Sequence, residues 1–473
     1  MTKPDEPMRP AGHAGSNGTV SISNPSGDTV GGPVEAPEFD PGAKPTLGEA
    51  FRVWTRIGFL SFGGPAGQIA LIHREVVEER GWLDEKTFLS ALNFSMLLPG
   101  PEAMQLATFA GWRLHGVVGG VIAGLLFVLP GALLVGAFSV LYALYGTLPV
   151  SQALFLGVKA AVLAIVFQAL IKVSRRALTG PAAYAMAAMA FLALFVFQLP
   201  FPLIVILAAV FGMFLIKVDA GDISIAPAPT KADDRLMVRK AVVTALVWLA
   251  VWIVPLAVFV AIMAPVSVFS DLAIFFSKLA VVTFGGAYAV LTYMAQEAVQ
   301  EFGWLKPGEM VDGLGLAETT PGPLILVTQF VGFLAAYRTG AEQPTLIYGV
   351  FGMVVTLWAT FAPCFLWIFT GAPFVSRLES MPRLRAALAG VTAAVVGVIA
   401  NLSVWFAFNV LFKGLSTLDV PGGQLTLPDL ATFNVLAFGL AVVGFVALFA
   451  FRFGVLSTLC ICAGLGLGTS AMI

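Results

Sequence analysis

Apolar runs long enough to cross a lipid bilayer fill most of the chain. Hydrophobic residues make up 58% of the sequence, charged residues make up only 11%, and the mean hydropathy is +0.91. Soluble domains carry about 25% charged residues, and a transmembrane helix needs about 20 consecutive apolar residues. The pattern therefore predicts an all-α polytopic membrane protein.

About thirteen runs are candidate spans. Two pairs of them contain Gly-Gly and Pro-Gly-Pro sequences, which interrupt helices, so we expect these runs to be broken or re-entrant. The interrupted pairs are 51–72 with 87–112 and 268–294 with 312–335. The other runs are 116–145, 150–172, 181–198, 202–217, 241–264, 345–371, 385–412, 430–450 and 453–471.

Three motifs occur twice at one constant interval, which indicates an internal repeat. We call the step from Ser61 to Thr283 the repeat interval, and all three motifs return after this step without a gap. Further on, Gly157 matches Gly390 at a slightly larger interval. The chain therefore has two related halves. The motifs are Ser/Thr-Phe-Gly-Gly at 61–64 and 283–286, Gly-Trp-Leu at 81–83 and 303–305, and Pro-Gly-Pro at 99–101 and 321–323.

The distribution of basic residues predicts that the two halves have opposite orientations. Short cytoplasmic loops are rich in Lys and Arg. The loop at 146–151 is uncharged, whereas its counterpart at 371–385 carries three arginines. The next loop reverses this bias, since the first half is basic around Arg175 and the second half has only Lys413. The unpaired run 241–264 would supply the odd crossing that inverts the second half, with the N-terminus in the cytoplasm and the C-terminus outside.

These observations divide the chain into five parts. The first part is rich in Pro, Gly, Ser and Asp, lacks the pattern of a signal peptide, and is predicted to be a disordered cytoplasmic tail. The parts are the tail at 1–46, the first repeat at 47–217, a cytoplasmic linker at 218–240, a linker transmembrane helix at 241–264 and the second repeat at 265–473.

The repeated motifs resemble those of the chromate ion transporter family. The resemblance rests on Ser-Phe-Gly-Gly-Pro at 61–65, Gly-Trp-Leu at 81–83, Leu-Pro-Gly-Pro at 98–101 and their second copies, and it covers about residues 48–471. It implies a two-domain protein of the bacterial inner membrane that exports chromate and confers resistance, with sulfate as an isosteric competitor. Another oxyanion as substrate, or an anion channel, are the alternatives. The second copy lacks the proline found at 65, so the two half-sites are expected to be unequal.

Chromate is a tetrahedral dianion, so a site for it must offer hydrogen-bond donors without trapping the ion. Glycine lets the backbone approach an ion, proline interrupts the helix, and the next half-helix then presents free N–H groups and the positive end of its dipole. The alternative is that these residues form kinks and close helix crossings. The predicted frame is Gly63, Gly64, Pro99, Gly100, Gly285, Gly286, Pro321 and Gly322.

Three basic residues lie inside apolar runs and are candidate substrate contacts. Arg56 and Lys278 each lie seven residues before the first glycine of their Gly-Gly pair, about two helical turns. They could contribute charge to one central site, or extend to the interface as anchors. Lys159 could contact substrate or pair with an acid on another helix.

Two carboxylates beside the Pro-Gly-Pro motifs are candidate proton carriers, because ionisable groups within a membrane are costly and usually functional. Glu102 follows the first motif and Glu318 precedes the second. Either could instead cap a half-helix. Thr320 could donate its hydroxyl to an oxyanion or cap the break. The charged segment 73–80 is expected to be a solvated loop, with a gate as the alternative.

Other functional classes find no support in the sequence. The net charge of -1 gives no basic field for nucleic acid. The three cysteines lie in apolar runs, and the three histidines are too scattered for a metal site. No dinucleotide-binding or Walker A pattern is present. We therefore expect a transporter without a cofactor, not an enzyme, whose partners are an oxyanion and the bilayer. A homodimer and the coupling ion are left open.

Overall fold

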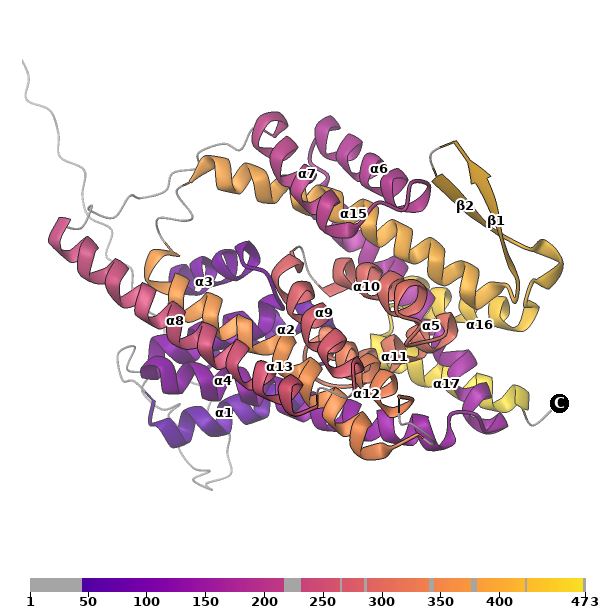
Figure 1. The fold of residues 1–473 in the computed structure, drawn as a ribbon, viewed down its shortest axis with the longest axis horizontal. Helices are drawn as coiled ribbons and strands as arrows, with labels where there is room; N and C mark the ends of the chain where they lie inside the picture. Colours follow the sequence, from indigo (N-terminus) through magenta and orange to yellow (C-terminus); the bar gives the residue numbers. More distant parts are fainter. Residues whose placement is uncertain are drawn as a thin grey trace, which may run out of the picture. The chain divides into compact units, whose positions relative to one another are not determined.

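The computed structural model describes residues 45–216, 231–263, 266–284, 287–339, 344–375, 381–421 and 423–470. Almost all of this part of the chain is helical, so the prediction of an all-α polytopic membrane fold is confirmed (Figure 1). The predicted tail up to residue 44, most of the predicted linker, and Gly285 with Gly286 lie outside the described residues.

The first half consists of helices alone. They are α1 (Leu47–Leu60), α2 (Gly64–His73), the π-helical turn η1 (Arg74–Glu78), α3 (Glu85–Leu97), α4 (Glu102–Tyr145), α5 (Pro149–Ala177), α6 (Pro181–Phe195) and α7 (Phe201–Leu215).

The linker helix is α8 (Lys231–Ile262). The elements of the second half are α9 (Val268–Val282), α10 (Ala287–Gln296), η2 (Glu297–Glu301), α11 (Pro307–Thr319), η3 (Leu324–Leu326), α12 (Val327–Tyr337), α13 (Leu346–Gly371), η4 (Ala372–Phe374), α15 (Pro382–Leu411), β1 (Leu415–Val420), β2 (Gly423–Pro428), η5 (Leu430–Thr432), α16 (Val435–Phe445), η6 (Val446–Ala450) and α17 (Val455–Ser470).

Five of the described helices are long and apolar enough to cross a membrane, and shorter apolar helices account for further candidate runs. The runs that contain Gly-Gly or Pro-Gly-Pro are interrupted, as expected. In the first half, α1 stops at Leu60 before α2, and α3 stops at Leu97 before α4. In the second half, α9 stops at Val282 and α11 stops at Thr319. The broken segments therefore enter the helical core from each half without forming continuous spans.

Helix α4 is a hairpin of two helices. Its 44 residues would extend about 66 Å if straight, roughly twice the thickness of the hydrocarbon core. The backbone leaves the helical region at His115 and Gly116. A Cβ atom on Gly111 would collide with the carbonyl oxygen of Gly119, so the two segments lie against each other. Gly332 of α12 and Gly352 of α13 approach in the same way in the second half.

Equivalent helices of the two halves pair in antiparallel directions. The second segment of α4 and α13 each contain a proline, and Pro130 and Pro363 are as far apart in the sequence as Gly157 and Gly390. Along this pair Gly120 lies beside Phe369, whereas Gly136 lies beside Met353. The residue numbers rise on one helix as they fall on the other. This is the relation that an inverted repeat requires.

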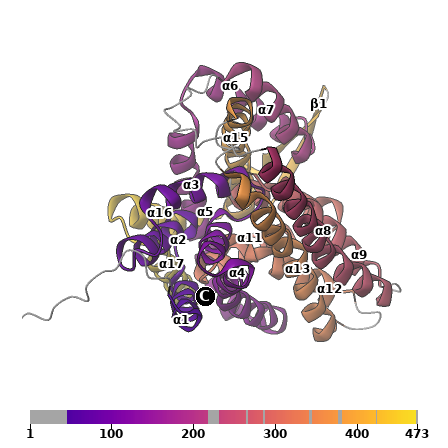
Figure 2. The same cartoon turned by 90° about the vertical axis from the view of Figure 1, so that its left-hand side faces the viewer.

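The two halves also exchange their peripheral helices. Helices α6 and α7 pack on α15 of the other half, and α16 and α17 pack on α5 (Figures 1 and 2). A Cβ atom on Gly397 of α15 would collide with the carbonyl oxygen of Ala187 in α6. A Cβ atom on Gly157 of α5 would collide in the same way with the carbonyl oxygen of Cys462 in α17. Small residues let these backbones approach closely, as in other membrane helix pairs.

These contacts place the ends of α5 and α15. Ala187 of α6 lies beside Gly397 of α15, and Leu194 lines a pocket with Leu402, so α6 and α15 run in the same direction. A short connection joins α5 to α6. The end of α5 and the beginning of α15 therefore lie together. We call this the basic end, because Arg175, Arg176, Arg383 and Arg385 belong to it.

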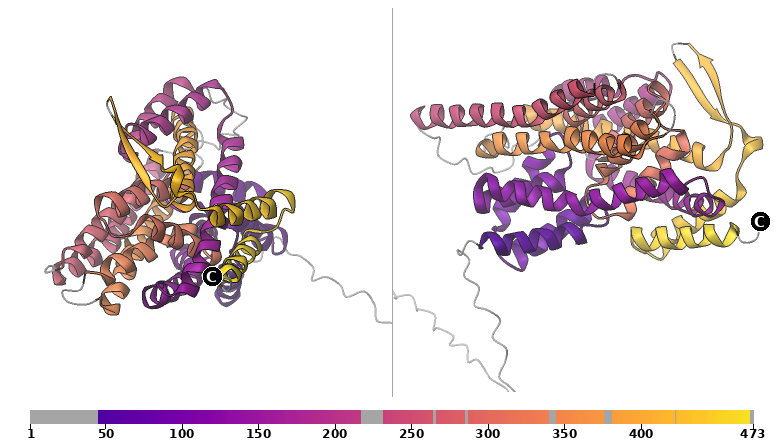
Figure 3. Two further views of the ribbon diagram at one scale, coloured as in Figure 1. Left: turned by 90° about the vertical axis from the view of Figure 1, so that its right-hand side faces the viewer. Right: turned by 60° about the horizontal axis from the view of Figure 1, so that its bottom comes forward.

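The opposite end, which we call the hairpin end, carries an antiparallel β-hairpin formed by β1 and β2 (Figure 3). The prediction of an exclusively helical chain omitted this hairpin. The alternating polar and apolar residues at 415–420 are typical of a strand, but this short pattern lies between two long apolar runs. The hairpin follows α15, and the corresponding connection in the first half, between α5 and α6, covers only 178–180. The backbone N–H of Gln424 donates to the carbonyl of Val196, which ties the hairpin to the α6–α7 connection.

The close approach within α4 predicts a difference between two identical substitutions. Gly111→Ala forces the hairpin segments apart, so we expect it to destabilise the protein by about 1–3 kcal/mol, as overpacking does. Gly439→Ala in α16 meets no atom within 4 Å and improves helix propensity, so it should leave stability unchanged or raised. Thermal unfolding in detergent compares the two variants. Equal stability of both would contradict the hairpin packing.

Candidate functional site

The helix breaks of the two halves are hydrogen-bonded to each other. The backbone N–H of Gly322 donates to the carbonyl oxygen of Ser61 at 3.0 Å and to its Oγ at 2.9 Å. The backbone N–H of Gly100 donates to the carbonyl oxygen of Thr283 at 2.8 Å. Ser61 and Thr283 are repeat equivalents, as are Gly100 and Gly322. The same cross-connection therefore occurs twice, and it brings the Ser/Thr-Phe-Gly-Gly motif of each half into contact with the Pro-Gly-Pro motif of the other half.

Two buried glutamines complete these breaks. Gln68 Nε2 donates to the carbonyl oxygen of Gly322 at 2.6 Å and to that of Ser61 at 3.2 Å. Gln105 Nε2 donates to the carbonyl oxygen of Pro99 at 2.7 Å. A buried amide is costly unless it is hydrogen-bonded, and here it replaces the ladder bonds that the breaks remove. Neither glutamine was predicted from the sequence, although each is a polar residue in an otherwise apolar run.

The glycines of the predicted frame fall into two groups. Gly63 and Gly64 have positive φ angles of 87° and 72°, and a Cβ atom on either would meet nothing within 4 Å. Gly100 and Gly322 also have positive φ, but both are packed against neighbouring atoms and use their N–H groups between the halves. The first pair can therefore present backbone to an ion, whereas the second pair serves the connection between the halves.

The residues next to the second break have structural partners. The carbonyl oxygen of Pro321 lies against Gly131 of α4, where an added Cβ atom would collide with it. Thr320 Oγ1 donates to the carbonyl oxygen of Ala317 at 3.1 Å. The hydroxyl thus binds the end of α11, which is the capping alternative of the two interpretations of Thr320.

The structure does not bring Arg56 and Lys278 to the breaks. Arg56 Nε lies 3.4 Å from Glu75 Oε1, and the arginine side chain is 55% exposed while the glutamate is fully buried. Arg80 forms a second ion pair with Glu75. Lys278 is exposed on α9. The repeat equivalent of Glu75 in the second half is Glu297. In the first half, the buried carboxylate of Glu75, in the turn that follows α2, binds the side chain of Arg56.

Lys159 pairs with an acid on another helix, one of its two interpretations. Its Nζ lies 3.2 Å from Asp312 Oδ2 of α11, and Tyr142 Oη donates to the same oxygen at 2.8 Å. Asp312 is buried. The sequence showed this aspartate only as a lone charge at the start of an apolar run, and nothing in the sequence linked it to Lys159.

The two candidate proton carriers have different surroundings. Glu318 is 6% exposed, and its Oε1 accepts a hydrogen bond of 2.6 Å from Tyr288 Oη. Within the described residues, Glu318 has no ion-pair partner. Glu102 is the first residue of α4 and is partly exposed, and Arg176 acts on it electrostatically. A buried carboxyl without a cation is the stronger candidate, because charge in a membrane interior is expensive.

A pocket at the basic end opens between α2 and α3. We call it the basic pocket. It has a volume of about 640 Å³. Its ionisable lining residues are His73, Arg74, Glu78 and Arg176. The charged segment at 73–80 therefore lines a cavity through part of its length and also forms polar contacts, among them a hydrogen bond of 2.7 Å between His73 Nε2 and Glu85 Oε2.

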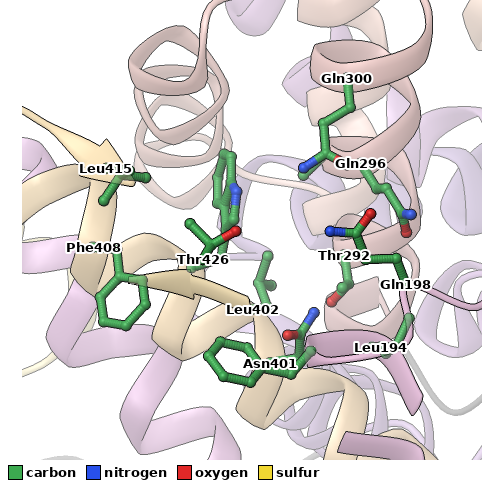
Figure 4. A pocket seen from close by; sticks show the side chains of 13 residues that line it. Leu194, Gln198, Thr292, Gln296, Gln300, Asn401, Leu402, Phe408, Leu415 and Thr426 are labelled. Carbon is green, nitrogen blue, oxygen red and sulfur yellow. The ribbon is translucent and has the colours of Figure 1, made fainter. Parts of the chain in front are cut away.

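A second pocket lies at the hairpin end, and we call it the amide pocket (Figure 4). Its volume is about 70 Å³. Apolar residues of α6 and α15 and two hairpin residues, Leu415 and Thr426, form the rest of its wall. The polar residues around it are Gln198, Thr292, Gln296, Gln300 and Asn401.

The two pockets occupy equivalent places in the two halves. At the repeat interval, Ala70 of the basic pocket corresponds to Thr292 of the amide pocket, and Arg74 corresponds to Gln296. Arg176 of the basic end lines the basic pocket, and Leu415 and Thr426 of the hairpin line the amide pocket, so the two pockets lie at opposite ends. Broken helices at the interface of two repeats are typical of membrane transporters.

Comparison with known proteins agrees with this architecture. The family model described as chromate transporter matches residues 48–213 and 270–468. A chromate transport protein of Pseudomonas aeruginosa is 34% identical over 74% of this chain and 79% of its own length. A chromate transport protein of Cupriavidus metallidurans is 28% identical over 82% of this chain and 87% of its own length. No solved structure matches the chain. The chain is therefore a member of the chromate transporter family.

Proposed function

We propose that this protein is a secondary transporter that exports chromate across the inner membrane of a bacterium and thereby confers chromate resistance. The observation that carries the proposal is the pair of equivalent pockets at opposite ends of a core whose helix breaks are hydrogen-bonded between the halves. The named function of the relatives supports chromate as substrate. Transport of labelled chromate into everted membrane vesicles, with and without a proton gradient and with sulfate as competitor, tests it.

The difference in pocket size supports a state that is open at the basic end. Ala66 and Met96 line the basic pocket, and their equivalents in the second half are Tyr288 and Glu318. The hydrogen-bonded pair of a tyrosine and a glutamate occupies the place of two smaller or more flexible side chains. In the proposed cycle this pair separates the amide pocket from the breaks, and its rearrangement opens the hairpin end.

The proposed chromate site lies at Gly63 and Gly64, at the start of α2. The open space beside both glycines allows an ion to approach the backbone. The first turn of α2 offers N–H groups and the positive end of the helix dipole. Dipoles hold a dianion less tightly than a fixed cation would, and a transported ion must also leave. Glu318 remains the proposed proton carrier.

The arginines support an orientation with the basic end in the cytoplasm. Arg175 and Arg176 lie in the last turn of α5, and Arg383 and Arg385 lie in the first turn of α15. All four arginines are therefore at the basic end. Short basic connections favour the cytoplasmic side. The proposal therefore has a cytoplasmic N-terminus, an outer hairpin end and an inverted relation of the repeats to the membrane.

Sidedness predicts which positions react with an impermeant thiol reagent added from the periplasm. Cysteines introduced at Thr147 and Ser416 should be labelled in intact cells, whereas those at Arg175 and Arg383 should react only after permeabilisation. Labelling at position 175 or 383 in intact cells would exclude this orientation. The protein's own three cysteines are replaced first, and the background variant serves as the blank.

The glycine site predicts a large effect of Gly63→Ala on transport. A methyl group would enter the space that an ion uses, so we expect the half-saturating chromate concentration to rise about tenfold, the equivalent of ~1.4 kcal/mol. Gly303→Ala is the control, because Gly303 also has a positive φ and open space around it but lies away from the breaks. It carries the same backbone strain. Equal transport by the two variants would remove Gly63 from the site.

The proposed proton carrier predicts a separation of coupling from exchange. Glu318→Gln retains an acceptor for the Tyr288 hydroxyl but cannot carry a proton. We expect chromate–chromate exchange to persist while the stimulation of net export by a pH gradient is lost. Tyr288→Phe keeps the carboxyl and should retain the stimulation. A pH-gradient response of the Gln variant equal to that of wild type would assign coupling to another group.

A further inference from the structure

We propose that the amide pocket is the release site for the oxyanion: a neutral site that binds a tetrahedral dianion through side-chain amides at the hairpin end. The inference rests on the proposed function and adds a second, weaker site to it. The residues that line the amide pocket carry no charge, so the distribution of charges along the chain does not reveal the pocket. Its amide residues come from α10, η2, α15 and the α6–α7 connection.

Four amide side chains line one cavity: Gln296 and Asn401 are half-buried, whereas Gln198 and Gln300 are exposed at its mouth. Gln198, Gln296, Gln300 and Asn401 surround it together with Thr292 (Figure 4). Within the described residues, none of the four amide groups takes part in a hydrogen bond. Each amide has two N–H donors, so the group can surround an anion that has acceptors on every side. The volume of 70 Å³ exceeds the roughly 10–15 Å³ needed for one water molecule.

Charged residues of the first half have neutral counterparts in and around the amide pocket. His73, Arg74 and Glu78 of the basic pocket correspond to Ala295, Gln296 and Gln300. At the larger interval that relates α5 to α15, Trp405 and Phe408 of the amide pocket stand where the first half has Lys172 and Arg175. The first half thus draws an anion toward its pocket, whereas the second half can bind it only by neutral hydrogen bonds.

The α6–α7 connection repeats the same exchange. Gln198 has a positive φ of 49°, and Arg452, at the corresponding place in the α16–α17 connection, has 54°. A left-handed conformation is uncommon for residues other than glycine, so the geometry belongs to the repeated connection. The side chain that it carries differs: an arginine in the α16–α17 connection and an amide in the amide pocket.

The unequal pockets suit a cycle in which the basic end captures the ion and the hairpin end releases it, while the proton gradient of the proposed function supplies the direction. A basic pocket captures a dilute dianion, because opposite charges attract over distance and raise its local concentration. A neutral pocket has no such attraction and releases the ion readily to the outside. The β-hairpin adds a cover that the first half lacks, since Leu415 and Thr426 line the pocket and Gln424 is bonded to Val196.

Charge substitutions at Gln296 test the proposal in oriented proteoliposomes. The half-saturating chromate concentration is measured from each face by counterflow. Gln296→Glu should raise it about tenfold at the hairpin end, because the added charge repels a dianion, and leave it unchanged at the basic end. Gln296→Arg, which copies Arg74, should lower it about tenfold at the hairpin end and slow net export. Gln300→Arg serves if that variant does not fold.

Two matched controls separate the pocket from its surroundings. Arg74→Gln makes the reverse change in the basic pocket and should weaken binding at the basic end only. Gln152→Glu adds the same charge at the beginning of α5, at the hairpin end but outside the pocket, where the wild-type amide donates to the carbonyl of Thr147. It should leave both faces unchanged, and an effect as large as that of Gln296→Glu would overturn the inference.

Gln198→Gly distinguishes binding from scaffolding. Glycine relieves the left-handed backbone, so the thermal stability should stay equal or rise, while the half-saturating concentration at the hairpin end rises about threefold through loss of an amide donor. Unchanged affinity in this variant and in the Gln296 variants, with active wild-type protein, would overturn the release site. Absence of chromate transport by the wild-type protein would instead overturn the proposed function.

Discussion

The architecture depends on one pair of hydrogen bonds, in which the broken backbone of each half is satisfied by the other half. Gly322 donates to Ser61, and Gly100 donates to Thr283. In a membrane interior every exposed N–H group costs several kcal/mol, and interrupted helices are tolerated only where protein or an aqueous cavity surrounds them. Neither half supplies these partners alone. The breaks can therefore exist because the two halves meet at their motifs.

This mutual satisfaction also explains why the halves are packed so tightly. Equivalent helices pair in antiparallel directions along α4 and α13, and each half gives two helices to the long helix of the other. Glycines lie at the crossings, where an added Cβ atom would collide with backbone. Such an interface keeps the breaks in register.

The proposed function depends on differences in charge between equivalent positions of the two halves. A symmetric molecule would bind an anion equally at both ends and would give no preference to either. Here the frame is repeated while the charges are not. The ionisable positions 73, 74 and 78 of the basic pocket are occupied by Ala295, Gln296 and Gln300 in the other half. The hydrogen-bonded Tyr288–Glu318 pair occupies the positions equivalent to Ala66 and Met96. Fold and selectivity thus lie on different residues of the same repeat.

The sequence by itself determined the membrane-spanning class, the repeat with its constant interval, and the positions of the helix breaks. These follow from local composition and from glycine and proline chemistry, which act within a few residues. From the sequence alone, Lys159 had two interpretations, and Arg56 and Lys278 were candidate substrate contacts in the same way as the glycines. Only the tertiary structure decided that Arg56 pairs with Glu75, that Lys159 pairs with Asp312, and that Gly100 and Gly322 are occupied between the halves. The pockets and their amides were equally out of reach, because a cavity is made by residues of separate elements that packing brings together, and no local pattern encodes such contacts.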